Sequence, residues 1–150
     1  MTLRRELAGD RERLREQADT LRAREVTPTS DEVLCDAVAM TLHRLYAAVE
    51  KLFERVADHF EGKPQGPSWH RDLFVQVGSA LEGRPAVISS EEVKAALGEL
   101  LRFRHYVIHG SVSIAVDGER LVGLRERVLD ALKGLEEDLD RFDAFLAQRG

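Results

Sequence analysis

The sequence predicts an all-α protein, an antiparallel helical bundle of about five helices. Apolar residues recur at spacings of three and four through most of the 150-residue chain, and this period places them on one face of a helix. The chain contains only 4 prolines and 11 glycines, a composition typical of a soluble helical protein. A chain of this length buries one core but not comfortably two, so we expect a single domain over residues 1–150.

The first helix is expected over about residues 3–24, a highly charged segment with a thin apolar stripe. The stripe consists of Leu3, Leu7, Leu14, Ala18 and Leu21. A narrow stripe indicates an amphipathic helix that packs on its neighbours through one face. This N-terminal helix, within residues 1–24, is expected to precede a core bundle formed by residues 30–150.

The second helix, about residues 30–61, is expected to be the spine of the bundle, because its apolar spacing persists over about eight turns. Thr29 and Glu32 fit a capping box at its start. Its apolar residues are Val33, Leu34, Ala37, Val38, Leu42, Leu45, Val49, Leu52, Phe53, Val56 and Phe60. The prolines and glycines of residues 62–69 cannot continue a helix, so a turn is expected there.

Two shorter helices are expected next. Ser68 can cap the third helix. The apolar residues of that helix are Trp69, Leu73, Phe74, Val77 and Leu81. Ser89 and Glu92 form a second capping box, which opens the fourth helix over about residues 90–109. Gly110 fits the C′ position just after this helix.

The last part of the chain is expected to begin with a stretch that is not helical. Residues 111–121 are interpreted as an extended excursion, with a turn at Asp117 and Gly118. A final helix then continues to the C-terminus on a three-four stripe. The stripe consists of Leu121, Leu124, Val128, Leu132, Leu135, Leu139, Phe142 and Leu146.

The composition excludes several classes of protein. The longest apolar runs are far shorter than a membrane span, and the charged start of the chain is unlike a secretory signal. Cys35 is the one cysteine, which excludes an internal disulfide and a cysteine zinc site. These features point to a cytoplasmic protein without a membrane partner. The net charge of −5 repels phosphate, so a nucleic-acid site would be a local basic pocket.

The run LLRFRHYVIHG, residues 100–110, places cationic and titratable side chains among the apolar residues of a helix. On a helical wheel of about 100° per residue, Arg104 falls in the middle of an apolar arc. The arc consists of Val93, Ala96, Leu97, Leu100, Leu101, Phe103, Val107 and Ile108. His105 and His109 lie together at one margin of it. An unpaired buried charge is expensive, so a stripe meant only for burial would not place its one guanidinium there.

The cationic residues of this run have two explanations, a catalytic role and a structural ion pair. A guanidinium can neutralise a phosphate and a histidine can take or give a proton, and these two tools suffice to cleave RNA without a metal. The structural alternative is an interhelical pair between Arg104 and a carboxylate, with incidental histidines. A metal held by His105 and His109 is disfavoured, because Tyr106 stands where a zinc-protease motif has its glutamate and no third ligand is evident. We therefore expect neither a metal nor a cofactor.

The other polar features have simpler interpretations. His43, His59 and His70 are expected to be ordinary surface or boundary histidines. The acidic run GLEEDLDRFD, residues 134–143, is expected to be the solvated face of the last helix, with partner recognition as the alternative. The sequence contains neither a glycine-rich phosphate loop nor a serine in a nucleophile elbow.

The run at residues 100–110 resembles the signature of the HEPN superfamily, in which an arginine is followed after four to six residues by a histidine. Arg104 and His109 match this motif, and His105 matches the polar residue that typically follows the arginine. The surrounding segments LLRFRH, GPSWHRDL, RPAVIS and LVGL resemble a branch of HepT-like ribonuclease toxins. The resemblance covers roughly residue 31 to the C-terminus.

This resemblance implies an all-α bundle that dimerises with its two motifs facing each other across a cleft. It implies the toxin of a type II toxin–antitoxin system, acting as a metal-independent endoribonuclease. Arg104 would hold the scissile phosphate, His109 would be the general acid–base, and His105 would orient His109 or add positive charge. The implied partners are a second copy of the chain, an RNA substrate and a minimal nucleotidyltransferase antitoxin.

Two features of the sequence bear on the antitoxin. The best-known branch carries a tyrosine that the antitoxin adenylylates two residues after the motif histidine, and Ser111 stands at that position here. The net charge suits a basic protein better than bulk RNA, so we expect part of residues 136–140 to help hold the nucleotidyltransferase. The alternative to a ribonuclease is a non-catalytic HEPN-like module that binds such a partner or a nucleic acid.

Overall fold

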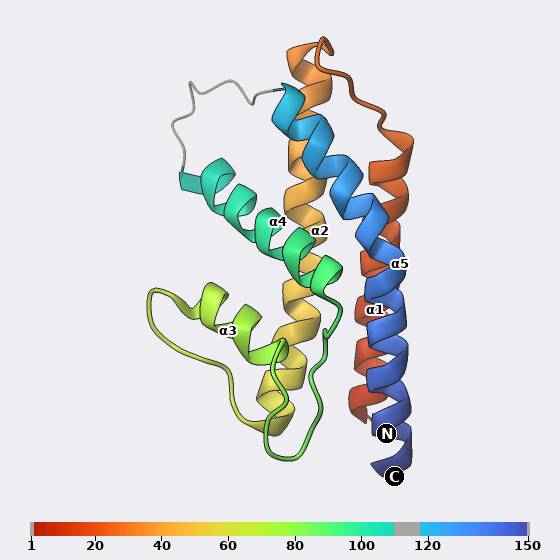
Figure 1. The fold of residues 1–150 in the computed structure, drawn as a ribbon, viewed down its shortest axis with the longest axis vertical. Helices are drawn as coiled ribbons and strands as arrows, with labels where there is room; N and C mark the ends of the chain where they lie inside the picture. Colours follow the sequence, from red (N-terminus) through yellow and green to blue (C-terminus); the bar gives the residue numbers. More distant parts are fainter. Residues whose placement is uncertain (1, 110–117, 150) are drawn as a thin grey trace.

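The computed structural model describes the backbone of residues 2–109 and 118–149, and the side chains of residues 2–104 and 118–149. Five helices run through these residues. They are α1 (Thr2–Ala23), α2 (Glu32–Phe60), α3 (Trp69–Val77), α4 (Glu91–His109) and α5 (Gly118–Arg149). The described residues form no strand beyond an isolated bridge between Leu81 and Arg84. The predicted all-α bundle is confirmed (Figure 1).

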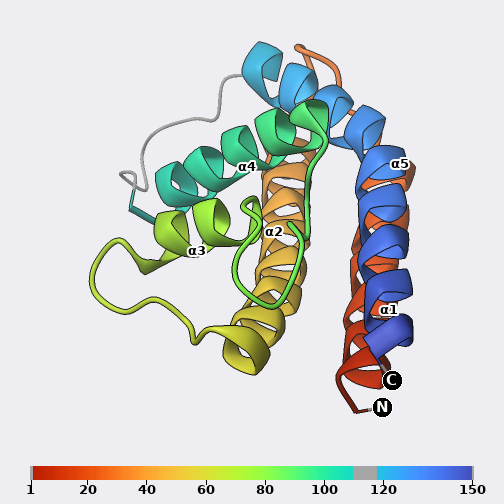
Figure 2. The same ribbon diagram turned by 60° about the horizontal axis from the view of Figure 1, so that its bottom comes forward.

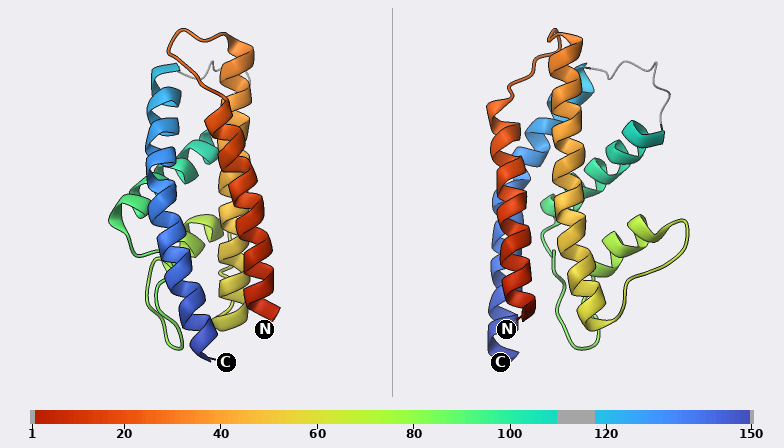
Figure 3. Two further views of the ribbon diagram at one scale, coloured as in Figure 1. Left: turned by 90° about the vertical axis from the view of Figure 1, so that its right-hand side faces the viewer. Right: turned by 180° about the vertical axis from the view of Figure 1, so that it is seen from behind.

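Three long helices form the body of the bundle (Figures 1 and 3). α1 runs antiparallel to both α2 and α5, so the two ends of the chain lie at the same end of the molecule. α3 and α4 lie on the side of α2 that faces away from α1 (Figure 2). None of the helices in the described part of the chain is long and apolar enough to cross a membrane.

The predicted apolar stripes form the core. The buried residues of α1 and α5 include Leu3, Leu7, Leu14, Ala18, Leu21, Leu121, Leu124, Val128, Leu132, Leu135, Leu139, Phe142 and Leu146. In α2 the stripe is buried from Val38 to Val56, whereas Val33 is 80% exposed. Val33 lies in the first turn of α2.

The start of α2 differs from the predicted capping box. The helix begins at Glu32, and the Asp31 carboxylate accepts a hydrogen bond from the Leu34 backbone N–H at 2.9 Å. The Thr29 hydroxyl instead lies 3.3 Å from that of Thr27. Thr29 is therefore not the cap. Asp31 takes this role because its carboxylate is placed directly before the first helical residue.

The start of α4 also differs, because a buried carboxylate of α5 takes part in it. The Ser90 hydroxyl, not that of Ser89, accepts from the Val93 N–H, at 3.5 Å. Asp138 accepts from the backbone N–H groups of Ser89 and Ser90 at 3.2 and 3.3 Å, and from the Ser89 hydroxyl at 3.2 Å. The Ser89 hydroxyl is thus bound to α5 and is not available to cap α4.

α3 is shorter than its apolar pattern indicates, and it ends at Val77. Ser68 is its N-cap by position, but the Ser68 side chain makes no capping hydrogen bond. Leu81 lies in the following connection and is 38% exposed. The buried Arg84 holds this connection, because its guanidinium donates to the Glu61 carboxylate and to the Ser79, Gln76 and Pro85 carbonyls.

α5 begins at Gly118, earlier than predicted, since residues 118–121 are helical and not extended. A Cβ at Gly118 would lie 2.7 Å from the Pro28 carbonyl oxygen, so only glycine allows the two segments to approach this closely. A glycine is therefore needed at position 118 for close packing against Pro28, and it begins a helix there. The predicted C′ position of Gly110, the predicted excursion over residues 111–117 and Ser111 lie outside the described residues.

Candidate active site

Arg104 lies in the C-terminal half of α4, on a helix whose inner face is apolar. The buried residues of the predicted arc are Val93, Ala96, Leu97, Leu100 and Phe103. Leu101 and Arg104 are half-buried. The structure thus confirms that an arginine interrupts the inner face of this helix.

The Arg104 guanidinium has no carboxylate partner in the part of the chain that the structure describes. Its Nε atom is buried and makes no hydrogen bond. The interhelical arginine–carboxylate pair that the sequence left open is therefore not found among the described residues. A half-buried cation in such surroundings is costly unless an anion from outside the chain neutralises it.

Arg104 faces a polar stripe on α2 formed by His43, Tyr46 and Glu50, which are spaced by three and four and so share one face of the helix. Burial lowers the pKa of His43, and the positive charges of Arg104 and Arg44 lower it further. Burial raises the pKa of Tyr46, the Glu50 carboxylate adds to this, and Arg104 opposes it. His43 Nδ1 is buried without a hydrogen-bond partner. The charge of Arg104 thus acts directly on this stripe.

The far end of this stripe is a hydrogen bond between α2 and α3. Glu50 is 6% exposed, and its Oε2 lies 2.7 Å from Nδ1 of His70. The ring of Trp69 stacks on that of His70 with 3.7 Å between the ring centres, and Lys63 Nζ lies 5.0 Å from the centre of the Trp69 ring. His70 lies at the boundary as expected, with its side chain 31% exposed, and its imidazole is in addition tied to a buried carboxylate.

α3 and α4 lie beside each other in opposite directions (Figure 2). A Cβ at Gly98 of α4 would lie 3.7 Å from the Phe74 ring in α3. A Cβ at Gly78, just after α3, would lie 3.4 Å from the Lys94 side chain in α4. The antiparallel α3 therefore begins toward the C-terminal half of α4, which contains Arg104. The start of α3 and Arg104 both lie against the stripe on α2, His70 at Glu50 and Arg104 near His43 and Tyr46.

The two motif histidines lie in the final turns of α4, which ends at His109. The side chains of His105 and His109 are outside the described residues, so their roles remain predictions. On an ideal helix His109 is about 7.5 Å along the axis from Arg104 and about 140° around it.

Sequence reasoning missed Tyr46 and Glu50, and it gave His70 no role. The signal that was present is the spacing of His43, Tyr46 and Glu50, a polar stripe beside the apolar stripe of the same helix. The pair of Glu50 with His70 has no such signal, because the two residues are on different helices and no period connects them.

The described residues include no group of three histidine, cysteine, aspartate or glutamate side chains placed to hold a metal ion. Cys35 is buried, and its thiol donates to the Ser30 carbonyl at 3.7 Å. His59 is exposed at the far end of α2, where its ring contacts that of Phe60.

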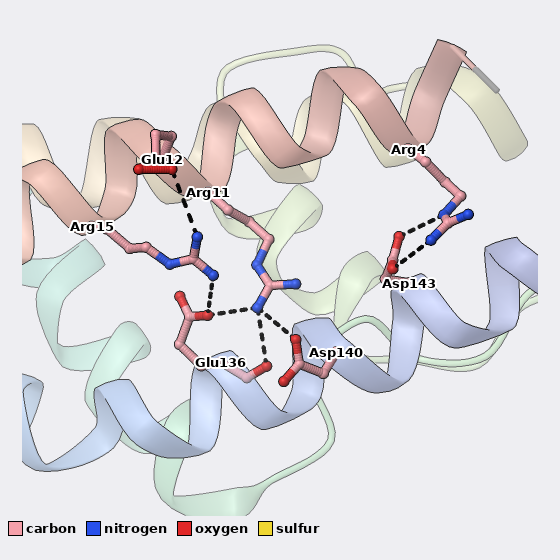
Figure 4. Close-up of polar contacts among 7 residues, drawn as sticks. All are labelled: Arg4, Arg11, Glu12, Arg15, Glu136, Asp140 and Asp143. Carbon is pink, nitrogen blue, oxygen red and sulfur yellow. Dashed lines mark hydrogen bonds and ion pairs between the residues drawn. The ribbon is translucent and has the colours of Figure 1, made fainter.

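The acidic run of α5 is bound by arginines of α1 (Figure 4). Glu136 accepts from Arg11 at 2.5 Å and from Arg15 at 2.9 Å. Arg11 also donates to Asp140 at 2.8 Å. Asp138 is buried against the start of α4, so the interpretation of this run as a solvated face is wrong for Asp138, whereas the Glu136 side chain remains 31% exposed. These carboxylates hold helices of the same chain together.

A family model described as "HepT-like protein" matches residues 37–146, which extend from α2 to the end of α5 and include the motif. The chain belongs to the HepT-like family. The predicted HEPN-type relationship is confirmed, and α1 is the helix that lies outside the matched HepT-like region. Neither the curated proteins nor the solved structures contain a match.

Proposed function

We propose that this HepT-like protein is the toxin of a type II toxin–antitoxin system and acts as a metal-independent endoribonuclease in the cytoplasm. The observation that supports this most is the state of Arg104. Its guanidinium interrupts an apolar helix face, its Nε is buried without a partner, and no described carboxylate neutralises it. A phosphate of bound RNA supplies the negative charge and the hydrogen-bond acceptors that this guanidinium does not find among the described residues.

In this proposal Arg104 holds the scissile phosphate and stabilises the negative charge that builds up on it. His109 is the general acid–base that takes the proton from the ribose 2′-hydroxyl, and His105 orients His109 or adds positive charge. Attack of the 2′-oxygen on phosphorus leaves a 2′,3′-cyclic phosphate on one product. No step needs a metal ion.

We place this site at the cleft of a homodimer. On one helix Arg104 and His109 point about 140° apart, so a second copy of the motif supplies the complementary groups more readily than one helix does. Light scattering is expected to give a dimer at micromolar concentration. A monomer under these conditions would count against a site shared between two copies.

The proposed partner is a minimal nucleotidyltransferase that neutralises the toxin. Co-expression of the nucleotidyltransferase encoded beside this gene is expected to restore growth and to co-purify with the protein. Because Ser111 replaces the tyrosine, adenylylation is tested separately, by intact mass of the protein recovered from that complex. A mass that is unchanged, with growth restored, indicates neutralisation by binding.

Cleavage of cellular RNA by purified protein tests the function. Arg104→Ala and His109→Ala are expected to lose activity, and Arg104→Lys is expected to lose it too, since a point charge cannot replace the planar fork that grips two phosphate oxygens. Arg22→Ala is the matched control, because it removes an exposed arginine of α1 whose ion pair within the described residues is with Asp19. EDTA is expected to leave cleavage unchanged.

Cleavage that survives Arg104→Ala, or that EDTA abolishes, would contradict this mechanism. Wild-type protein that binds the nucleotidyltransferase but cleaves no RNA would instead support the non-catalytic HEPN-like module.

A further inference from the structure

The Glu50–His70 pair is a second titratable group in the region of Arg104. Glu50 is 6% exposed, and burial of an ionised carboxylate is costly unless it is paired. His70 is its hydrogen-bond partner, at 2.7 Å. A leucine at position 50 would pack in α2 without this cost, so packing alone does not account for a carboxylate here.

The pair fixes the orientation of the imidazole. A carboxylate only accepts hydrogen bonds, so Nδ1 of His70 carries the proton that it donates to Glu50. Nε2 lies on the opposite edge of the ring, and the side chain of His70 remains 31% exposed. An imidazole held through Nδ1 by a carboxylate, with Nε2 open to a substrate, is the arrangement of a proton-transfer residue.

The pair and Arg104 act on the same side chains. The charges of Glu50 and Arg104 both influence the pKa of His43 and that of Tyr46. Phe74 lies beside Gly98 and Lys94 beside Gly78, so the antiparallel α3 begins toward the C-terminal half of α4, which contains Arg104. His70, bound to Glu50, and Arg104, whose charge acts on His43 and Tyr46, therefore both lie against the polar stripe of α2.

RNA cleavage needs two proton transfers at opposite ends of one phosphate. One group accepts the proton of the 2′-hydroxyl, and another donates a proton to the 5′-oxygen that leaves. A single imidazole cannot do both in one step. With one His109 as the acceptor, the donor is either a histidine of the second motif at the cleft or a group outside the motif.

We propose that His70 is this donor and that Glu50 is its positioning residue, an inference that rests on the ribonuclease function proposed above. The 2′-oxygen forms a bond to phosphorus, the bond from phosphorus to the 5′-oxygen breaks, and its electron pair stays on that oxygen. Nε2 of protonated His70 gives its proton to the 5′-oxygen, while His109 takes the 2′ proton. The products are a 2′,3′-cyclic phosphate and a 5′-hydroxyl, and the proton returns from His109 to His70 through water.

The variant that tests this role is His70→Asn. The asparagine amide places a donor near the position of Nδ1, which keeps a partner for the buried Glu50, but it has no group that transfers a proton from the position of Nε2. His59→Asn is the matched control, because it makes the same change at an exposed histidine at the far end of α2. Both variants are expected to melt within a few degrees of the wild type, and melting curves check this.

The decisive substrate is an RNA oligonucleotide that contains a mapped cleavage site, prepared with oxygen or with sulfur as the 5′ bridging atom. A thiolate leaves without protonation, so a sulfur substrate does not need the donor. His70→Asn is expected to cleave the oxygen substrate at least about 100-fold more slowly than the wild type, and the sulfur substrate within about fivefold of it. Glu50→Gln is expected to show a smaller loss, also restored by sulfur, because the amide oxygen still accepts from Nδ1. His59→Asn is expected to cleave both substrates like the wild type.

The outcomes separate this inference from the function on which it rests. His70→Asn that cleaves the oxygen substrate like the wild type, or that is equally slow on both substrates, overturns the role of His70 and leaves the ribonuclease intact. Wild-type protein that cleaves neither substrate overturns the ribonuclease, and the role of His70 with it.

Discussion

Arg11 in α1 and Arg104 in α4 each bury an Nε atom that has no hydrogen-bond partner, yet the two guanidinium groups have opposite surroundings. Arg11 donates to the carboxylates of Glu136 and Asp140 in α5, at 2.5 and 2.8 Å (Figure 4). Arg104 forms no ion pair with a carboxylate among the described residues, although the polar stripe of α2 that it faces contains Glu50. The same type of side chain thus has different partners on the two sides of α2.

The electrostatics of the two arginines follow these contacts. Burial lowers the pKa of Arg11, but its hydrogen bonds to Glu136 and Asp140 outweigh this and raise the pKa overall. The charge of Arg11 is therefore neutralised within the chain and stabilises the fold. Arg104 instead adds positive charge to the neighbourhood of His43 and Tyr46, and its coulombic effect lowers the pKa of His43 and opposes the raised pKa of Tyr46.

The comparison predicts that the acidic run of α5 contributes structure, most of all through Asp138. Asp138→Ala removes the acceptor of two backbone N–H groups and one hydroxyl at the start of α4. The free energy of unfolding is expected to fall by about 2–4 kcal/mol, because buried donors lose their partner. Urea unfolding measures this. Glu137→Ala, at the exposed neighbouring residue, is the control. An equal loss of unfolding free energy in both variants would contradict the structural role of Asp138.

A smaller and pH-dependent effect is expected at Glu136. Burial raises the pKa of its carboxyl, but hydrogen bonds from Arg15 and Arg11 outweigh this and lower it overall. A lowered folded-state pKa stabilises the protein above the ordinary value of 4.5, and this contribution is lost as the pH falls through the folded value. Glu136→Gln is expected to cost about 0.5–1 kcal/mol at pH 7 and progressively less below pH 4.5, as measured by urea unfolding. A difference that grows as the pH falls would contradict this sign.

The smallest effect is expected at Arg4, which pairs with Asp143 at the exposed end of the same helix pair, at 2.8 and 2.9 Å. Solvent screens this pair and both side chains are exposed, so its contribution to stability is small. Arg4→Ala is expected to leave both the melting temperature and RNA cleavage unchanged. A clear loss of stability would show that burial does not decide which ion pairs matter along α1 and α5.

The sequence was sufficient for the helices because each apolar stripe lies within one segment and repeats with a single period. Its errors are at the helix ends. Thr29 and Ser89 were plausible caps, but Asp31 is better placed in one case and the Asp138 carboxylate binds Ser89 in the other. The early start of α5 was missed because the close contact between Gly118 and Pro28 is tertiary.

The residues of the candidate site also differ in whether they could be predicted from one helix alone. Arg104 could be singled out from one helix, because a charge on an apolar arc is visible in the sequence. Its neighbours on α2 and the Glu50–His70 pair depend on how three helices pack, which no local pattern specifies. The ion pairs of Arg11 depend equally on packing, so the sequence could not tell an arginine with two carboxylate partners from one that has none among the described residues.

Arg11→Ala and Arg104→Ala, compared in one set of unfolding and RNA-cleavage measurements, test the central claim most directly. Arg104→Ala is expected to abolish cleavage and to change the free energy of unfolding by less than about 0.5 kcal/mol, whereas Arg11→Ala is expected to cleave normally and to lose about 1–2 kcal/mol of stability. The account is contradicted if Arg104→Ala unfolds much more readily than Arg11→Ala while RNA cleavage persists.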